Sequence, residues 1–279
     1  MADRNISDIS KTLIYLLMVA FTVLAIYPIF WLIIQSFKTT QEYLTTNKMG
    51  MPKLWFFGNY PYSWKMGKFG TLLLNSIFYT FITVGAVVLL SLMAAFAFAK
   101  INFRATKLFH GLFIIGILLT HQSILVPLFL MINSARLYNT RLGVLIPYIG
   151  LGLPMGVYLC TEFVKSIPGE LIESARIDGA KYLRIFSSIV FPMCVPVAVT
   201  LAIISFTGTW NEFMLINILT SSDAIKSIPV GIARFSGALA TDYGKQFSAL
   251  VIGLVPILIF YSIFRKQITK GVAAGAVKG

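Results

Sequence analysis

Four polar side chains stand inside long apolar runs of this sequence: His121, Gln122, Asn211 and Glu212. Such groups are costly within a bilayer, and they normally face the interior of a helix bundle or a water-filled path. Polar side chains also serve as hydrogen-bonding links between neighbouring helices. Two interpretations are therefore open for each residue: part of a path through the membrane, or a structural contact to another helix, loop or subunit.

Covalent chemistry has no recognisable motif in the sequence. There is no Gly-x-x-x-x-Gly-Lys-Ser/Thr phosphate loop, no metal-ligand cluster and no Ser/His/Asp or Cys/His set. Cys160 and Cys194 fall inside apolar segments, without the spacing of a zinc site or of a disulfide framework. We therefore expect no catalytic residue, no metal site and no cofactor in this chain.

The most densely patterned polar segment is residues 165–190. Pro168 suits the first turn of a helix, and Glu170 complements the positive end of the helix dipole. Gly179 relaxes the backbone, and Asp178 is suited to cap the N-terminus of a second helix. The pattern predicts two short helices with a bend, at which small side chains let the backbone press closely against another surface.

This segment resembles the cytoplasmic loop of binding-protein-dependent ABC importer permeases. The resemblance is carried by Glu173-Ser174-Ala175 and Asp178-Gly179-Ala180, followed by Phe186, Pro192 and Pro196. Ser174 stands where alanine is usual, which is a change between small residues. The resemblance implies that Glu173 to Ala180 form a coupling helix that docks on an ATPase dimer, where ATP and Mg are bound. The competing interpretation is an amphipathic loop on the membrane surface, attracted to anionic lipid.

Two further segments resemble the carbohydrate branch of this family, in its maltose-type form and in the shorter six-span subunit. They are Trp210-Asn211-Glu212-Phe213 and the glycine-spaced C-terminus that contains Gly275 and Lys278. The resemblance implies a sugar or related polyhydroxy solute, a second homologous permease and an extracytoplasmic solute-binding protein, which the outer loop 220–246 reaches. It also implies that the C-terminal tail enters the ATPase interface.

The elements that must position these residues are apolar spans. Hydrophobic residues make up 57% of the chain and charged residues 12%, which is too apolar for an ordinary soluble domain. Six runs reach the roughly 20 residues that a spanning helix needs: 12–34, 71–99, 108–132, 142–164, 189–219 and 247–264. We expect an all-α integral membrane protein with six transmembrane helices and, from the resemblance, the type I ABC importer permease fold.

The expected organisation is a cytoplasmic tail (1–11), a transmembrane domain (12–264) and a second cytoplasmic tail (265–279). Six spans return both termini to one side, and the short basic loop 100–107 favours the cytoplasm for that side. The loop 35–70 is then on the outer face. The net charge of +13 is scattered over loops, which fits contact with anionic lipid better than nucleic acid. The expected location is a bacterial or archaeal cell (inner) membrane.

The competing function is a secondary transporter or channel that is not driven by ATP. Charged residues buried in several spans, or inverted repeats, favour that class. The sequence has few of the former and no strong internal repeat. It does not identify the solute, because mono-, di- and oligosaccharides, polyols and glycerol-phosphate-like compounds are all compatible with it.

Overall fold

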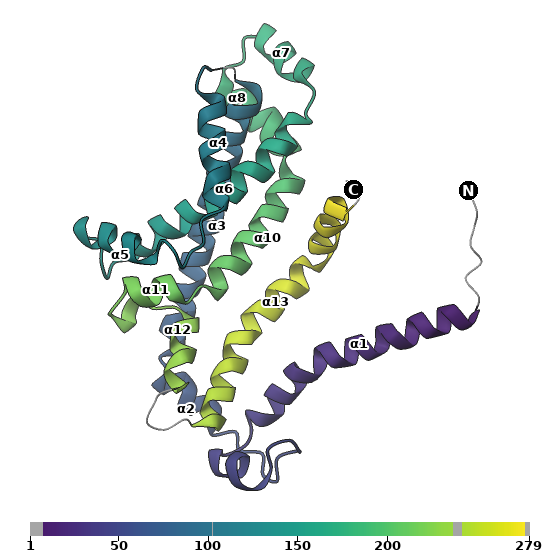
Figure 1. Cartoon of the computed structure of the whole chain (residues 1–279), viewed down its shortest axis with the longest axis vertical. Coiled ribbons are helices and arrows are strands. Elements are labelled where there is room, and N and C mark those ends of the chain that lie inside the picture. The colour runs from purple at the N-terminus through teal and green to yellow at the C-terminus, as the bar shows by residue number, and fades with distance from the viewer. Residues whose placement is uncertain (1–7, 102, 237–241, 277–279) are drawn as a thin grey trace. The chain divides into compact units, whose positions relative to one another are not determined.

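The computed structural model describes the backbone of residues 8–101, 103–236 and 242–276, and the side chains of residues 10–101, 103–235 and 242–266. All regular structure in these residues is helical, as predicted (Figure 1). The chain divides into two compact units. The first comprises Met1–Phe69 and Ile232–Pro256, and the second comprises Gly70–Gly231 and Ile257–Gly279.

The first unit contains one long apolar helix and a folded loop. Its elements are α1 (Asp8–Gln35), a π-helical turn (Glu42–Thr46), α2 (Asn59–Met66), a 3-10 turn (Arg234–Ser236) and the first part of α13 (Tyr243–Ala276). Most described side chains of α1 are exposed. The buried Asn59 amide donates to the backbone oxygens of Ser36 and Lys38, both at 2.8 Å. The loop after α1 is therefore held by specific bonds.

Lys38 shows how closely this loop folds. Its side chain is 0% exposed, and its Nζ donates to the backbone oxygen of Asn47 at 2.7 Å. Burial lowers the pKa of Lys38, and the negative charge of Glu42 partly opposes this change. A buried amine needs such a partner, because an unpaired charge is costly away from water. The loop carries a polar core of its own.

The second unit is a helix bundle. Its helices are α3 (Phe69–Lys100, nearly all in this unit), α4 (Thr106–Ile117), α5 (Leu125–Ser134), α6 (Arg141–Lys165), α7 (Gly169–Ile177), α8 (Tyr182–Ile185), α9 (Phe191–Met193), α10 (Val195–Asn211), α11 (Met214–Leu219), the start of α12 (Ile228–Ala233) and the part of α13 from Ile257 onward. A π-helical turn (Phe186–Val190) links α8 to α9, and a 3-10 turn (Asp223–Ile225) follows α11. Both α4 and α10 pack against α6, and α7 lies at one end of this bundle (Figure 1).

Four of the predicted spans correspond to single long helices. Within the described residues, Ser10–Gln35, Phe69–Lys100, Arg141–Lys165 and Tyr243–Lys266 are long and apolar enough to cross a membrane. Pro147 and Pro154 lie inside α6 without ending it, as membrane helices tolerate where neighbouring groups satisfy the freed backbone. Helix α13 continues to Ala276, so much of the expected tail 265–279 extends the last span as helix.

The third predicted span is not one helix. Residues 108–132 fall on α4 and α5, which are separated by turns. The polar run between them bonds to itself, with the hydroxyls of Thr120 and Ser123 2.6 Å apart. Pro127 has no N–H, which a helix tolerates only in its first turn, and α5 begins two residues earlier. Local polar bonds and proline together divide this segment.

The fifth predicted span, 189–219, is also broken. The helical axis bends by 76° between Tyr182–Met193 and Val195–Asn211. Pro192 and Pro196 flank this bend, and each stands in the first turn of its helix (α9 and α10), where a missing N–H is tolerated. Helix α10 then ends before Glu212, whose backbone is extended (ψ 125°), and α11 follows as a separate helix. The sequence located this apolar run but not its two breaks.

Candidate functional site

The patterned loop folds as a short helix with a bend at Gly179. Helix α7 follows Pro168, and Gly179 adopts a left-handed φ of +78°, which glycine does at little cost. The Ala180 N–H donates to the oxygen of Ala175 at 2.9 Å, and this bond closes the end of the helix. The predicted helix and bend are confirmed. The capping role predicted for Asp178 is wrong, because α8 begins after Lys181 with no side-chain cap.

The outer face of this loop is open. Glu173, Ser174, Asp178 and Gly179 are exposed, whereas Ala175 and Ala180 are half-buried. The apolar side chains of Ile177 and Leu183 are 87% and 74% exposed. Large apolar side chains beside acidic groups on one projecting loop are typical of a surface that binds another molecule.

The inner face of the loop is anchored in a continuous apolar cluster. We call it the loop-side cluster; its members are Val87, Leu92, Ala95, Phe96, Cys160, Val164, Ile167, Ile172, Ile185, Phe186, Val190, Cys194, Val197 and Leu201. Ile172 of α7 and Ile185 of α8 are thus packed with residues of α3, α6 and α10. The Lys100 Nζ also donates to the backbone oxygen of Ile167 at 2.5 Å. The loop and these helices therefore share one packed interior, and such interiors deform little.

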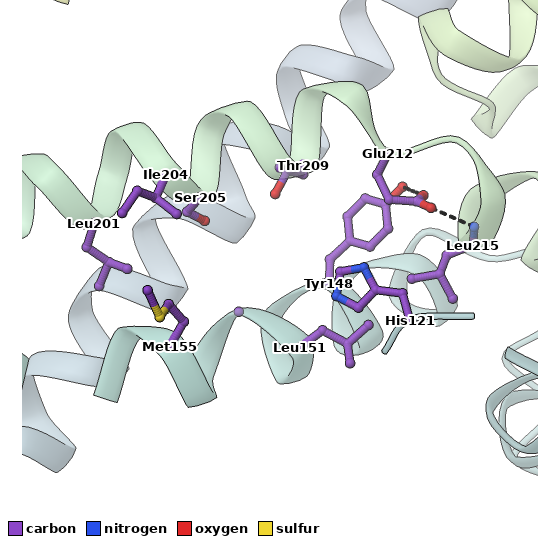
Figure 2. A pocket seen from close by; sticks show the side chains of 12 residues that line it. His121, Tyr148, Leu151, Met155, Leu201, Ile204, Ser205, Thr209, Glu212 and Leu215 are labelled. Atoms are coloured by element: carbon purple, nitrogen blue, oxygen red, sulfur yellow. Dashed lines mark hydrogen bonds between the residues drawn. The ribbon is translucent and has the colours of Figure 1, made fainter. Parts of the chain in front are cut away.

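A cavity of about 190 Å³ lies between α6 and α10 (Figure 2). It is lined by His121, Tyr148, Leu151, Gly152, Met155, Leu201, Ile204, Ser205, Gly208, Thr209, Glu212 and Leu215. His121 and Glu212 therefore line the same cavity, although they are far apart in sequence. Gln122 and Asn211 are not among the lining residues. Asn211 is exposed, and its amide donates to the Thr207 oxygen of its own helix at 2.9 Å.

Glu212 lines the cavity and also holds the structure together. Its carboxylate accepts from the Tyr148 hydroxyl at 2.6 Å and from the backbone N–H groups of Leu215 and Ile216 at 2.7 and 3.2 Å. The two backbone donors belong to the first turn of α11, where an acidic group stabilises free N–H groups. The structural-contact interpretation therefore holds for Glu212, and its place on a path through the membrane stays a prediction.

Tyr148 was missed by the sequence analysis. It lies in an apolar helix and is buried, with its hydroxyl on Glu212. A tyrosine inside an apolar span normally has a hydrogen-bond partner for its hydroxyl. This rule predicts from the sequence that Tyr148 has a partner. The identity of the partner depends on how α6 and α10 meet, which no local pattern in the sequence encodes.

Polar residues near the start of α3 hold the segment after α11. The Asn75 amide donates to the backbone oxygens of Ala224 and Lys226 at 2.8 and 3.0 Å, and the Tyr79 hydroxyl donates to Ile225 at 2.8 Å. The Ser76 hydroxyl accepts from the Ile228 N–H at 2.9 Å. The membrane helix thus fixes the beginning of the second long loop.

Two residues near the C-terminus, Gly275 and Lys278, were predicted to lie at the ATPase interface. Gly275 lies near the end of α13, and Lys278 lies outside the described residues. Their contact with an ATPase stays a prediction. Among the side chains described here, no group of three or more His, Cys, Asp or Glu residues is placed to hold a metal ion.

Comparison with known proteins decides the family. Residues 87–273, which are more than half of the chain, match the model of the binding-protein-dependent transport system inner membrane component. The chain belongs to this family. It is thus a multi-pass membrane permease subunit of an ABC importer, and it is not the ATPase. The resemblance inferred from the loop motif is confirmed.

Two relatives match this permease over most of its length. It is 31% identical to the diacetylchitobiose uptake system permease protein NgcG of Streptomyces coelicolor, over 99% of this chain and 91% of that protein. It is 32% identical to the trehalose transport system permease protein SugB of Mycobacterium tuberculosis, over 91% and 93%.

A solved structure shares the fold of this permease. A chain of a bacterial ABC transporter involved in the import of the acidic polysaccharide alginate superposes with a TM-score of 0.81 at 22% identity, covering 95% of this chain and 98% of the other. The predicted ABC importer permease fold is confirmed.

Proposed function

We propose that this permease carries a sugar or related polyhydroxy solute across a bacterial or archaeal cell (inner) membrane. It works with a second homologous permease, an ATPase dimer and an extracytoplasmic solute-binding protein. Relatives named for diacetylchitobiose and trehalose transport support the solute class. ATP and Mg are bound and used by the ATPase partner, since this sequence has no phosphate loop.

The proposal rests on the loop at α7, which has one exposed face and one face packed against the helix bundle. Its outer face is exposed around Glu173, Asp178 and Gly179, and its inner face is anchored in the loop-side cluster through Ile172 and Ile185. Closure of the ATPase dimer pushes on the outer face, and the cluster passes the movement to α3, α6 and α10. Contacts that differ between the inward-open and outward-open states supply the free energy for this switch.

Gly179 provides the sharpest mutational test of this docking role. A Cβ there meets no atom within 4 Å, but φ is +78°, a conformation that costs other residues about 1–2 kcal/mol. Gly179→Leu should reshape the bend and uncouple ATP hydrolysis from uptake in proteoliposomes, while the chain still inserts. Gly169→Leu is the matched control, because Gly169 is equally open without the left-handed backbone. Normal coupled uptake by Gly179→Leu would remove the docking assignment.

The partners are tested by purifying the permease from its native membrane in mild detergent. We expect an ATPase, a second permease and a solute-binding protein to accompany it. A homo-oligomer without an ATPase, in a preparation that preserves known complexes, favours a channel or secondary transporter instead.

A further inference from the structure

The wall of the cavity on α10 carries free hydroxyl groups. Ser205 and Thr209 are one helical turn apart and face Leu151 and Met155 of α6 across the cavity (Figure 2). Within the described part of the chain, neither hydroxyl has a hydrogen bond; side-chain bonds are formed instead by neighbours such as Thr207. His121 adds an imidazole from the segment between α4 and α5. Hydrogen-bonding groups and apolar surface thus face the same space, as in small-molecule sites.

Gly208 leaves this wall open. It lines the cavity between Ser205 and Thr209, and a Cβ built on it meets no atom within 4 Å. The volume of about 190 Å³ is below the roughly 300–1,000 Å³ of typical ligand pockets. This space therefore suits one ring of a solute rather than an entire oligosaccharide.

The charge of the lining limits the solute further. Among the twelve described residues that line the cavity there is no lysine or arginine, and Glu212 contributes a carboxylate. All three hydrogen bonds to this carboxyl group come from donors, so its oxygens act only as acceptors here. An anion placed beside it is repelled and finds no lining cation. Uronates and sugar phosphates are therefore disfavoured.

We infer that this cavity is a subsite for one neutral saccharide ring. Ser205, Thr209 and His121 hydrogen-bond its hydroxyls, and Leu151 and Met155 contact its apolar face. Glu212 acts as a positioning residue, since its oxygens are engaged by Tyr148 and α11. This inference rests on the proposed function and narrows it, because it selects neutral sugars and places one contact in this subunit.

The solute class is tested with the assembled transporter in proteoliposomes. The neutral probes are trehalose, diacetylchitobiose, melibiose and raffinose, and the acidic probe is an alginate oligosaccharide. We expect ATP-dependent uptake of at least one neutral probe and none of the acidic one. Uptake of the acidic probe alone would overturn the neutral subsite but leave the importer intact. If an assembled and ATP-hydrolysing complex takes up none of a wider saccharide panel, the proposed function itself fails.

The location of the subsite is tested by filling it. Gly208→Leu should reduce uptake of the transported neutral sugar at least tenfold, with normal assembly. Gly150→Leu is the matched control. Gly150 is helical and outside the cavity lining, and a Cβ built on it meets no atom within 4 Å. Uptake by this variant should therefore stay within twofold of the wild-type rate. Equal uptake by the two variants would overturn the subsite.

A smaller substitution tests the subsite even where the Gly208→Leu variant misfolds. Thr209→Val keeps the side-chain shape and removes one hydroxyl, so the KM for the neutral sugar should rise roughly three- to tenfold. The thermal unfolding temperature should be unchanged. An unaltered KM would contradict the proposed role of Thr209 in binding.

Discussion

Adjacent residues with the same sequence signal have different surroundings in this permease. Asn211 and Glu212 both interrupt an apolar run, yet Asn211 is exposed and bonded to its own helix. Glu212 accepts from Tyr148 and from α11 and lines the cavity. The difference arises because the helix ends between them, so the Glu212 side chain leaves the surface of α10. At this scale, the hydrogen-bond partners separate a positioning residue from an exposed one.

Asp242 offers a prediction about pH at the residue scale. Its carboxylate accepts from Thr40 at 2.6 Å and pairs with Lys245 at 2.6 Å. Burial by itself raises the pKa of Asp242, but these hydrogen bonds outweigh it and hold the pKa below the usual 3.8. The stabilisation is therefore complete well above pH 3.8 and is lost as the pH falls through the lowered pKa. Because the Asp242 side chain is 37% exposed, screening by solvent keeps the stabilisation that it contributes below about 1 kcal/mol.

Asp242→Asn should slightly lower the apparent unfolding temperature in detergent at pH 7, and this difference should shrink towards pH 3. The control is Glu162→Gln. Glu162 forms an i,i+3 ion pair with Lys165, and both side chains are about half exposed. Glu162→Gln should therefore lower the apparent unfolding temperature less than Asp242→Asn does. A loss from Asp242→Asn that grows on acidification would contradict the assignment.

At the scale of elements, α6 packs closely against its neighbouring helices. A Cβ on Gly156 would collide with the Ser91 hydroxyl of α3 and lie 3.2 Å from Leu201 of α10. Small residues allow such contacts between membrane helices. Gly156 therefore allows α3 and α10 to pack closely against α6.

Gly156→Ala should destabilise the permease by about 1–3 kcal/mol, since overpacking shifts neighbouring groups. Ser91→Ala in the same chain should recover part of this loss, because the nearest colliding atom is then absent. Gly150→Ala, with open space around its Cβ, should be neutral. Chemical unfolding in mixed micelles measures all four proteins, and equal stability of the two glycine variants would refute the close contact.

At the scale of the whole molecule, the remaining question is the side on which each loop lies. Cys160 and Cys194 are both buried, so the native thiols give little background in labelling. Met49 in the first long loop is 75% exposed and Ile177 in the α7 loop is 87% exposed. The predicted topology places these two positions on opposite sides of the membrane.

We expect an impermeant maleimide to label Met49→Cys on intact cells and Ile177→Cys only after the membrane is opened. This result places the loop at α7 in the cytoplasm, as the docking role requires, and agrees with cytoplasmic termini. Labelling of both positions from outside, or the reverse pattern, would contradict the topology.

Much of this protein was readable from its sequence. Apolar runs of roughly 20 residues or more located α1, α3, α6 and α13, because lipid exposure requires continuous apolar helix. Pro168 and Gly179 marked the ends of α7, since both act through local backbone geometry. The motif around Glu173 to Ala180 indicated the family, which the match over residues 87–273 confirms.

Other features were decided by the tertiary structure alone. The end of α10 at Glu212 interrupts a run that is apolar enough to continue as helix. This break persists because the Glu212 carboxylate accepts from the N–H groups of Leu215 and Ile216, and the distant Tyr148 hydroxyl holds that carboxylate in place. Likewise, His121 and Glu212 share a cavity because α6 and α10 pack together. Hydrophobicity determines which segments enter the bilayer, whereas contacts between distant residues determine what the polar side chains of those segments face.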